Sequence, residues 1–138
     1  MTQEEKQLLL IDLSARLPYK VKGIYARTDI KNLSICEITT HLYGEMEESF
    51  NGKEKYEFIP YLRPMSSMTQ EERRYLLEEL GFDEDLENGE LNDFGSYVYR
   101  SVNVLLLFDW LNEHHLDWRG LIPMGLALEA LEGMYKIS

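Results

Sequence analysis

Residues 108–120 read FDWLNEHHLDWRG and hold both tryptophans and two of the three histidines of the chain. At 100° per residue, most apolar side chains of residues 104–111 gather on one arc of a helix, with Asp109 and Glu113 opposite. The two histidines lie within or beside that arc, at its end. The pattern predicts a core helix over about residues 101–115, with Gly120 in the turn that leads into the C-terminal tail, the part of the chain after residue 120.

The length and composition indicate one cytoplasmic domain. A chain of 138 residues supports a single core, and its hydrophobic content of 44% is close to the average of globular proteins. No apolar run approaches the roughly 20 residues of a membrane helix, and the polar, acidic first residues do not fit a signal peptide. Cys36, the only cysteine, cannot form an internal disulfide, as is usual in a reducing compartment. We therefore expect one domain over residues 1–138, no membrane partner and a cytoplasmic location.

The charge balance restricts the partners. With 25 acidic against 14 basic residues, the formal net charge is −11. Such a chain repels phosphate backbones and anionic lipid surfaces, which disfavours binding to nucleic acid and to membranes. A solvated acidic surface is the simplest interpretation, and a basic protein is the partner that the charge favours.

Two capping boxes predict where helices begin. Thr2 and Glu5 have the spacing that lets each side chain bond the backbone N–H of the other, and Thr69 and Glu72 repeat the pattern. Apolar residues at helical spacing follow each box. The predicted helices cover about residues 3–16 and 69–80.

The remaining segments favour a small sheet. Polar and apolar residues alternate, or β-branched residues dominate, over residues 19–26, 33–43 and 53–59. An acidic connection with a tight turn at Asn51-Gly52 separates the last two. Residues 125–130 are either a further strand, which we favour, or a helical turn. The prediction is an α+β fold, with a small antiparallel sheet or partly curled barrel of about 3–5 strands packed by the three helices.

Two segments are predicted to be irregular. Residues 60–68 carry two prolines, so we expect a stiff, extended connector between the sheet and the second helix. Residues 82–93 are rich in Asp and Glu and poor in apolar side chains. This composition predicts a mobile acidic loop.

Two blocks of the sequence resemble a group of uncharacterised proteins. Residues 60–69 read PYLRPMSSMT, and residues 109–130 contain DWLNEHH followed by RGLIPMGLALEA. Together with the first helix, these blocks are similar to short proteins encoded by gut Bacteroidota and by their phages and mobile elements. The similarity covers about half of the chain, and Leu131 stands where proline is expected. It implies an accessory protein of a phage or mobile element in a bacterial cytoplasm, with no activity to carry over.

The histidines are the first candidates for chemistry. His114, His115 and Asp117 carry side chains that can bind zinc or move protons. The additions to such a site are Asp109 and, from distant parts of the sequence, His41 or Cys36. Neighbouring histidines on a helix diverge by about 100°, however, and no His-Glu-x-x-His pattern is present. The alternative is structural: the ring nitrogens satisfy the last carbonyls of the helix and the negative end of its dipole.

A second group of residues suits contacts with a partner. Trp118 and Arg119 lie beyond the predicted helix, and Arg63 lies in the other block. Tryptophan and arginine are enriched at protein interfaces. For Arg63 and Arg119, a salt bridge to Asp117 or Glu129 within the chain is a simpler role than contact with a partner.

Two functions follow as hypotheses. The sequence holds no phosphate loop, no Gly-x-Ser-x-Gly and no Cys-x-x-Cys, so we expect no cofactor. We favour a non-enzymatic accessory protein that binds another protein. The alternative is a small metal-dependent hydrolase that uses His114, His115 and Asp117, with Asp109 as a further acid–base candidate.

Overall fold

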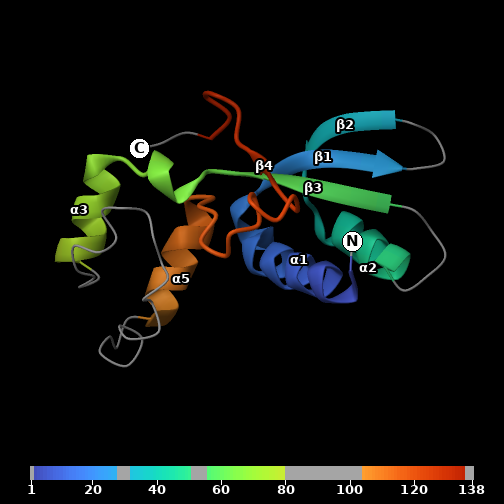
Figure 1. Cartoon of the computed structure of the whole chain (residues 1–138), viewed down its shortest axis with the longest axis horizontal. Coiled ribbons are helices and arrows are strands. Elements are labelled where there is room, and N and C mark those ends of the chain that lie inside the picture. Colours follow the sequence, from blue (N-terminus) through green and yellow to red (C-terminus); the bar gives the residue numbers. More distant parts are fainter. Residues whose placement is uncertain (1, 28–31, 51–55, 80–103, 136–138) are drawn as a thin grey trace.

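A computed structural model describes residues 2–27, 32–50, 56–79 and 104–135 (Figure 1). This part of the chain forms four α-helices and a four-stranded sheet, which confirms the α+β class. The helices are α1 (Gln3–Arg16), α2 (Thr40–Phe50), α3 (Gln70–Glu78) and α5 (Val104–Glu113). The strands are β1 (Lys22–Arg27), β2 (Asn32–Glu37), β3 (Tyr56–Leu62) and β4 (Leu128–Glu129).

The sheet is mixed and open. Its strand order is β2-β1-β3-β4; β1 runs antiparallel to β2 and to β3, whereas β4 runs parallel to β3. The sequence predicts an antiparallel sheet or a partly curled barrel. The described strands form neither, because the tail returns beside β3 in the parallel direction and β2 does not pair with β4.

The helices α1 and α2 cover one face of the sheet (Figure 1). Phe58 of β3 points to that face and packs with Leu9 of α1 and Met46 of α2 in one buried cluster. The close approach requires a glycine on β1, because a Cβ on Gly23 would lie 2.5 Å from a ring carbon of Phe58 and from the carbonyl oxygen of Ile59. The aromatic ring therefore lies directly over the backbone of the neighbouring strand.

A second core lies at the other end of the molecule, where β3 leads into α3 and α5 (Figure 1). Its buried members come from the connector, α3, α5 and the residues after α5. They are Met65, Met68, Leu76, Leu107, Leu111 and Leu116. The predicted core helix is thus confirmed as α5, although it lies in the helical core and not against the sheet.

Both predicted capping boxes are present. The N–H of Glu5 donates to Thr2 Oγ1 (3.1 Å), and the N–H of Thr2 donates to Glu5 Oε1 (2.9 Å). The same pair of bonds joins Thr69 and Glu72, at 3.1 and 2.9 Å. The bounds of α1 match the prediction, and α3 is described as far as Glu78. The helix predicted over 101–115 is described from Val104 and ends at Glu113, two residues early.

The strand predicted over residues 33–43 is wrong in its second half. β2 ends at Glu37, and α2 begins at Thr40 and extends through most of the predicted acidic connection. Thr39 is the reason: its hydroxyl accepts from the N–H of Leu42 (3.2 Å), and its carbonyl accepts from the N–H of Tyr43 (2.9 Å). Thr39 and Thr40 are β-branched and favour a strand, but Thr39 serves as the N-cap of α2 instead.

The predicted connector also begins too early, because residues 60–62 belong to β3. At the outer edge of β3, the Leu62 carbonyl accepts from the N–H of Ala130 (2.8 Å). Backbone groups of a strand alternate in direction, so the Pro60 nitrogen lies at this same outer edge, two residues before Leu62. No described strand pairs with Pro60 there, and its missing N–H therefore breaks no hydrogen bond.

The other boundaries shift less. β1 begins at Lys22, because residues 17–19 form a 3-10 turn and Lys20 is left-handed, with a φ of 57°. The strand favoured over residues 125–130 is confirmed in part as the short β4. The acidic loop predicted over residues 82–93 lies outside the described residues.

Candidate functional site

Residues 114–122, the histidine turn, follow α5 and reverse the chain. His115 is left-handed, with a φ of 60°. Its N–H donates to the Asn112 carbonyl (3.1 Å), and the N–H of Leu116 donates to the Leu111 carbonyl (3.0 Å). These two bonds form the Schellman arrangement that ends many helices, with histidine in the place that glycine usually takes.

His114 is held against its own helix. Its Nδ1 lies 2.8 Å from the Trp110 carbonyl oxygen, and its ring stacks on Trp110 with 4.1 Å between centroids. Trp110 in turn stacks on Tyr75 of α3 at 5.6 Å. The structural interpretation, in which a ring nitrogen bonds one of the last helix carbonyls, is confirmed for His114.

His115 points the other way, towards the tail. Its ring stacks on Tyr135 with 3.7 Å between centroids. Burial and, to a smaller extent, nearby cations, Arg16 first, lower the pKa of His115 to about 4, so the ring is neutral at pH 7. Among the described residues, its buried Nδ1 has no hydrogen-bond partner.

Tyr135 joins the tail to the sheet. Its hydroxyl donates to the Tyr61 carbonyl (2.7 Å) and accepts from the N–H of Lys22 (2.8 Å). Burial raises the pKa of Tyr135 to about 12, against the opposing effect of its hydrogen bond to Lys22 and of the charge on Arg16. The phenol is therefore a fixed donor and not a proton source at neutral pH.

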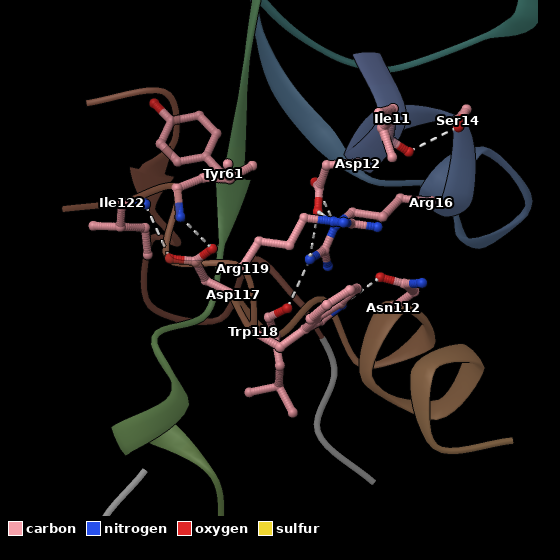
Figure 2. A network of polar contacts seen from close by, with 12 residues as sticks. Ile11, Asp12, Ser14, Arg16, Tyr61, Asn112, Asp117, Trp118, Arg119 and Ile122 are labelled. Atoms are coloured by element: carbon pink, nitrogen blue, oxygen red, sulfur yellow. Dashed lines mark hydrogen bonds and ion pairs between the residues drawn. The ribbon is translucent and has the colours of Figure 1, made fainter. Parts of the chain in front are cut away.

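Asp117 caps the backbone of the same turn (Figure 2). Its carboxylate accepts from the N–H groups of Leu121 (2.8 Å) and Ile122 (2.9 Å). Its own N–H donates to the Arg63 carbonyl at 2.8 Å. Because each carboxylate oxygen accepts a backbone N–H and the residue is buried, the role of Asp117 is to stabilise the fold of the turn.

A buried ion cluster links the turn to α1 (Figure 2). Arg16 donates from Nε to Asp12 Oδ2 (2.7 Å), and both side chains are fully buried. Arg16 Nη2 also donates to the Leu116 carbonyl (2.8 Å). Arg119 Nε donates to Asp12 Oδ1 at 3.1 Å. Two cations and one carboxylate thus hold the N-terminal helix against the histidine turn.

Arg63 forms a second buried ion pair. Its two terminal nitrogens donate to Glu72 of α3 at 2.9 and 2.6 Å, and further bonds reach the carbonyls of His114 and Ser67. Burial raises the pKa of the Glu72 carboxyl, but its hydrogen bonds to Arg63 and Thr69 outweigh this effect and leave the pKa below its ordinary value. The predicted salt bridges to Asp117 or Glu129 are wrong, because Arg63 pairs with Glu72 and Arg119 pairs with Asp12.

Trp118 lies half-buried beside these groups. Its Nε1 donates to Asn112 Oδ1 (2.9 Å), its ring packs on Phe108 with 4.6 Å between centroids, and the Arg119 guanidinium lies 4.1 Å from the ring centre. The proposed partner contacts are therefore largely occupied within the chain: Arg63 is 5% exposed, and Trp118 and Arg119 contact each other and their neighbours.

The predicted metal-binding side chains do not converge. His114, His115 and Asp117 are neighbours in sequence, but their side chains reach Trp110, Tyr135 and backbone N–H groups respectively. Asp109 is exposed on α5, Cys36 lies in β2, and His41 pairs with Glu45 on α2 at 3.0 Å. Across the described ranges, no three His, Cys, Asp or Glu residues are grouped so that they could hold a metal ion.

A pocket of about 330 Å³, the edge pocket, opens elsewhere, between α1, α2, β3 and the tail. Its buried wall is apolar and consists of Leu9, Met46, Phe58 and Leu126. Met124 lines it from the tail and is 44% exposed. The pocket therefore reaches the sheet core from the surface and is wide enough to take a side chain from outside.

The edge pocket lies along a part of β3 whose outer edge no described strand pairs with. The tail pairs with β3 at Tyr61 and Leu62, whereas Glu57, Phe58 and Ile59 line the pocket. Backbone groups of every second residue in a strand point to the same edge. The N–H and carbonyl of Phe58 therefore point to the same outer edge of β3, away from β1, as those of Leu62. Within the described strands nothing pairs with them, and an apolar cavity thus adjoins a free strand edge.

The sequence does not signal this pocket. Leu9, Met46 and Phe58 each read as ordinary core residues of separate elements, and Leu126 lies in a segment of undecided structure. The ion cluster had one local signal, the Asp12 and Arg16 pair at i and i+4. Neither Arg119 nor Glu72 could be assigned as a partner from spacing alone.

Comparison of the chain with protein-family models, curated proteins and solved structures finds no match to any of them. Of the helices that the structure describes, none is both long and apolar enough to cross a membrane.

Proposed function

We propose that the chain is a non-enzymatic accessory protein that binds another protein through the edge pocket and the adjoining edge of β3. One observation carries the proposal: a cavity with a buried apolar wall opens between α1, α2 and the tail, beside an edge of β3 that no described strand pairs with. Apolar cavities with a few polar groups at the mouth are typical binding sites, and a free strand edge is a common place for a partner segment to pair.

The chemistry of the histidine turn supports a binding role over catalysis. Its titratable side chains are committed to carbonyls, amides or aromatic rings. Catalytic groups need a reacting atom within hydrogen-bond reach; here the Asp117 oxygens and the His114 Nδ1 bond the backbone, and the His115 ring is stacked on Tyr135. The resemblance of residues 60–69 and 109–130 to proteins of phages and mobile elements supports an accessory role in the cytoplasm of a bacterial host.

Affinity capture from a bacterial lysate with matched variants tests the proposal. Met124→Arg puts a long cation at the mouth of the edge pocket, and Leu131→Arg makes the same change on the tail at a residue that does not line it; both positions are exposed. We expect the wild type and Leu131→Arg to capture the same protein, and Met124→Arg to capture about tenfold less. Equal capture by both variants, or no specific capture by the wild type, contradicts the proposal.

A further inference from the structure

The charge and shape of the edge pocket indicate what kind of side chain fits it. Its buried residues are apolar, and the two titratable residues that line it are acidic: Glu5, and Glu57, whose side chain lies on the opposite face of the sheet from Phe58. Within the described residues, neither glutamate is in an ion pair. A carboxylate in the pocket would be repelled by Glu5, whereas a cationic group would be attracted to it.

Glu5 is held in place as an anion. Its Oε1 accepts from the N–H of Thr2 in the capping box. The backbone and side-chain hydrogen bonds to Thr2 lower the pKa of Glu5, so it is ionised at neutral pH. A carboxylate carries further lone pairs beyond the one used by this bond, and it therefore offers a fixed negative group at the end of α1 that lines the pocket.

The strand edge sets the direction from which an occupant arrives. Residues opposite each other on paired strands have side chains on the same face of the sheet. Phe58 points to the face covered by α1 and α2. A residue of an added strand opposite Phe58 would therefore send its side chain into the pocket, towards Glu5. Its two sequence neighbours would lie on the other face, beside Glu57.

We propose that the edge pocket binds a Lys or Arg side chain of an extended basic segment of a partner protein, which pairs as an added strand with the outer edge of β3. The inference rests on the proposed function and specifies its partner. Lys and Arg have long aliphatic stems that cover apolar surface while the cationic head remains near polar groups. The stem lies against Leu9, Phe58 and Leu126, and the head reaches Glu5. The net charge of −11 attracts such a segment from a distance.

Titration of ¹⁵N-labelled protein with synthetic peptides tests the inference. The probe is an acetylated, amidated five-residue peptide of alternating valine and threonine with lysine at its centre, which ends opposite Pro60 and does not reach the residues of β3 that pair with β4. Three matched peptides carry at the centre norleucine, glutamate, or lysine with a methylated backbone nitrogen. We expect the lysine peptide to shift the amide signals of Phe58 and Leu126 saturably. The norleucine peptide should bind about two- to fivefold more weakly, and the other two should not bind measurably.

Two variants of α1 isolate the charge. Glu5→Gln keeps the capping box, because glutamine serves in the same position, but removes the negative charge from the pocket. Glu4→Gln removes a charge from the neighbouring exposed residue, which does not line the pocket. The lysine peptide should lose about two- to fivefold in affinity for Glu5→Gln and keep its affinity for Glu4→Gln.

The outcomes separate the inference from the proposed function. Equal binding of the norleucine and lysine peptides, equal effects of the two glutamine variants, or shifts confined to residues away from β3 would overturn the basic-segment proposal. Those results leave the protein-binding role intact if Met124→Arg still reduces capture from the lysate about tenfold. If the peptides fail and capture is also insensitive to Met124→Arg, both proposals fall.

Discussion

The histidine turn and the edge pocket both lie beside β3 and the C-terminal tail, but they use polar groups in opposite ways. In the histidine turn, Asp117 and His114 bond the backbone, and Arg119 bonds a buried carboxylate. In the edge pocket, Glu5 and Glu57 lack an ion-pair partner within the described chain, and the β3 edge lacks a paired strand. Residue types that suggest chemistry thus serve the fold in the first region, whereas in the second region polar groups are left without such partners among the described residues.

The largest loss of stability should come from breaking the buried ion pair between Arg63 and Glu72. Arg63→Met leaves Glu72, 4% exposed, without its cation. Removal of one partner of a buried ion pair costs about 3–5 kcal/mol. Urea unfolding should show this loss, while Arg74→Met, on the exposed side of α3, should change the free energy of unfolding by less than about 0.5 kcal/mol. A cost below about 1 kcal/mol for Arg63→Met would contradict the structural role of this pair.

The next largest loss of stability should come from the close contact of Gly23 with Phe58 and Ile59, beneath the edge pocket. Gly23→Ala puts a Cβ 2.5 Å from the Ile59 carbonyl oxygen and the Phe58 ring, and overpacking of this kind costs about 1–3 kcal/mol. Gly44→Ala is the matched control, because a Cβ there meets nothing within 4 Å. In the interior of α2 it should stabilise by about 0.5–1 kcal/mol. Thermal unfolding of the two variants should shift in opposite directions; a shift in the same direction would argue against the close approach of β1 and β3.

The histidine turn should lose stability in acid. The pKa of His115 is about 4 in the folded chain against an ordinary value of 6.5, so the unfolded state binds the proton more readily. Stability from the neutral ring is complete above pH 6.5 and falls as the pH drops towards 4. The loss should be on the order of 1–2 kcal/mol, allowing for the partial exposure of the ring.

Urea titrations at pH 7 and pH 4.5 measure this dependence. His115→Asn, which tolerates the left-handed backbone, should reduce the difference in stability between the two pH values. His41→Asn, at a side chain that is 81% exposed, should leave that difference close to the wild-type value. If His115→Asn leaves it unchanged, the ring is not buried in its neutral form.

The smallest effect should appear at the mouth of the edge pocket. Met124→Arg and Leu131→Arg are both exposed changes, so each should alter the free energy of unfolding by less than about 0.5 kcal/mol. Denaturant unfolding of the two variants checks this expectation. A larger loss for Met124→Arg would mean that the pocket mouth supports the fold, and it would weaken the contrast with the histidine turn.

Local signals of the sequence predicted local structure well. The capping boxes at Thr2 and Thr69 depend on groups three residues apart, and both form as expected. The end of the predicted strand at residue 43 was wrong, because Thr39 is equally suited to a strand and to a helix N-cap. Which of the two forms depends on whether Leu42, Tyr43 and Met46 can pack on α1, a contact between residues far apart in the sequence.

The candidate sites show the same division. The sequence singled out His114, His115, Asp117 and Arg63, and all four lie at structurally demanding places. The long-range partners of this region were not predictable: Arg119 bonds Asp12 across 107 positions, and Tyr135 bonds Tyr61 across 74. The edge pocket needs four separate segments to meet, so no single stretch of sequence carries its pattern.

The sequence by itself determined the α+β class, the starts of α1 and α3, the turn after α5 and the acidic charge, because these depend on composition and on residues within one or two helical turns. Only the tertiary structure decided that the tail pairs in parallel with β3, that the histidines face different neighbours, and that no described strand pairs with the part of the β3 edge beside the pocket. The physical reason is that long-range pairing depends on which apolar faces can be buried together, and many pairings satisfy the same local pattern until the whole chain has packed.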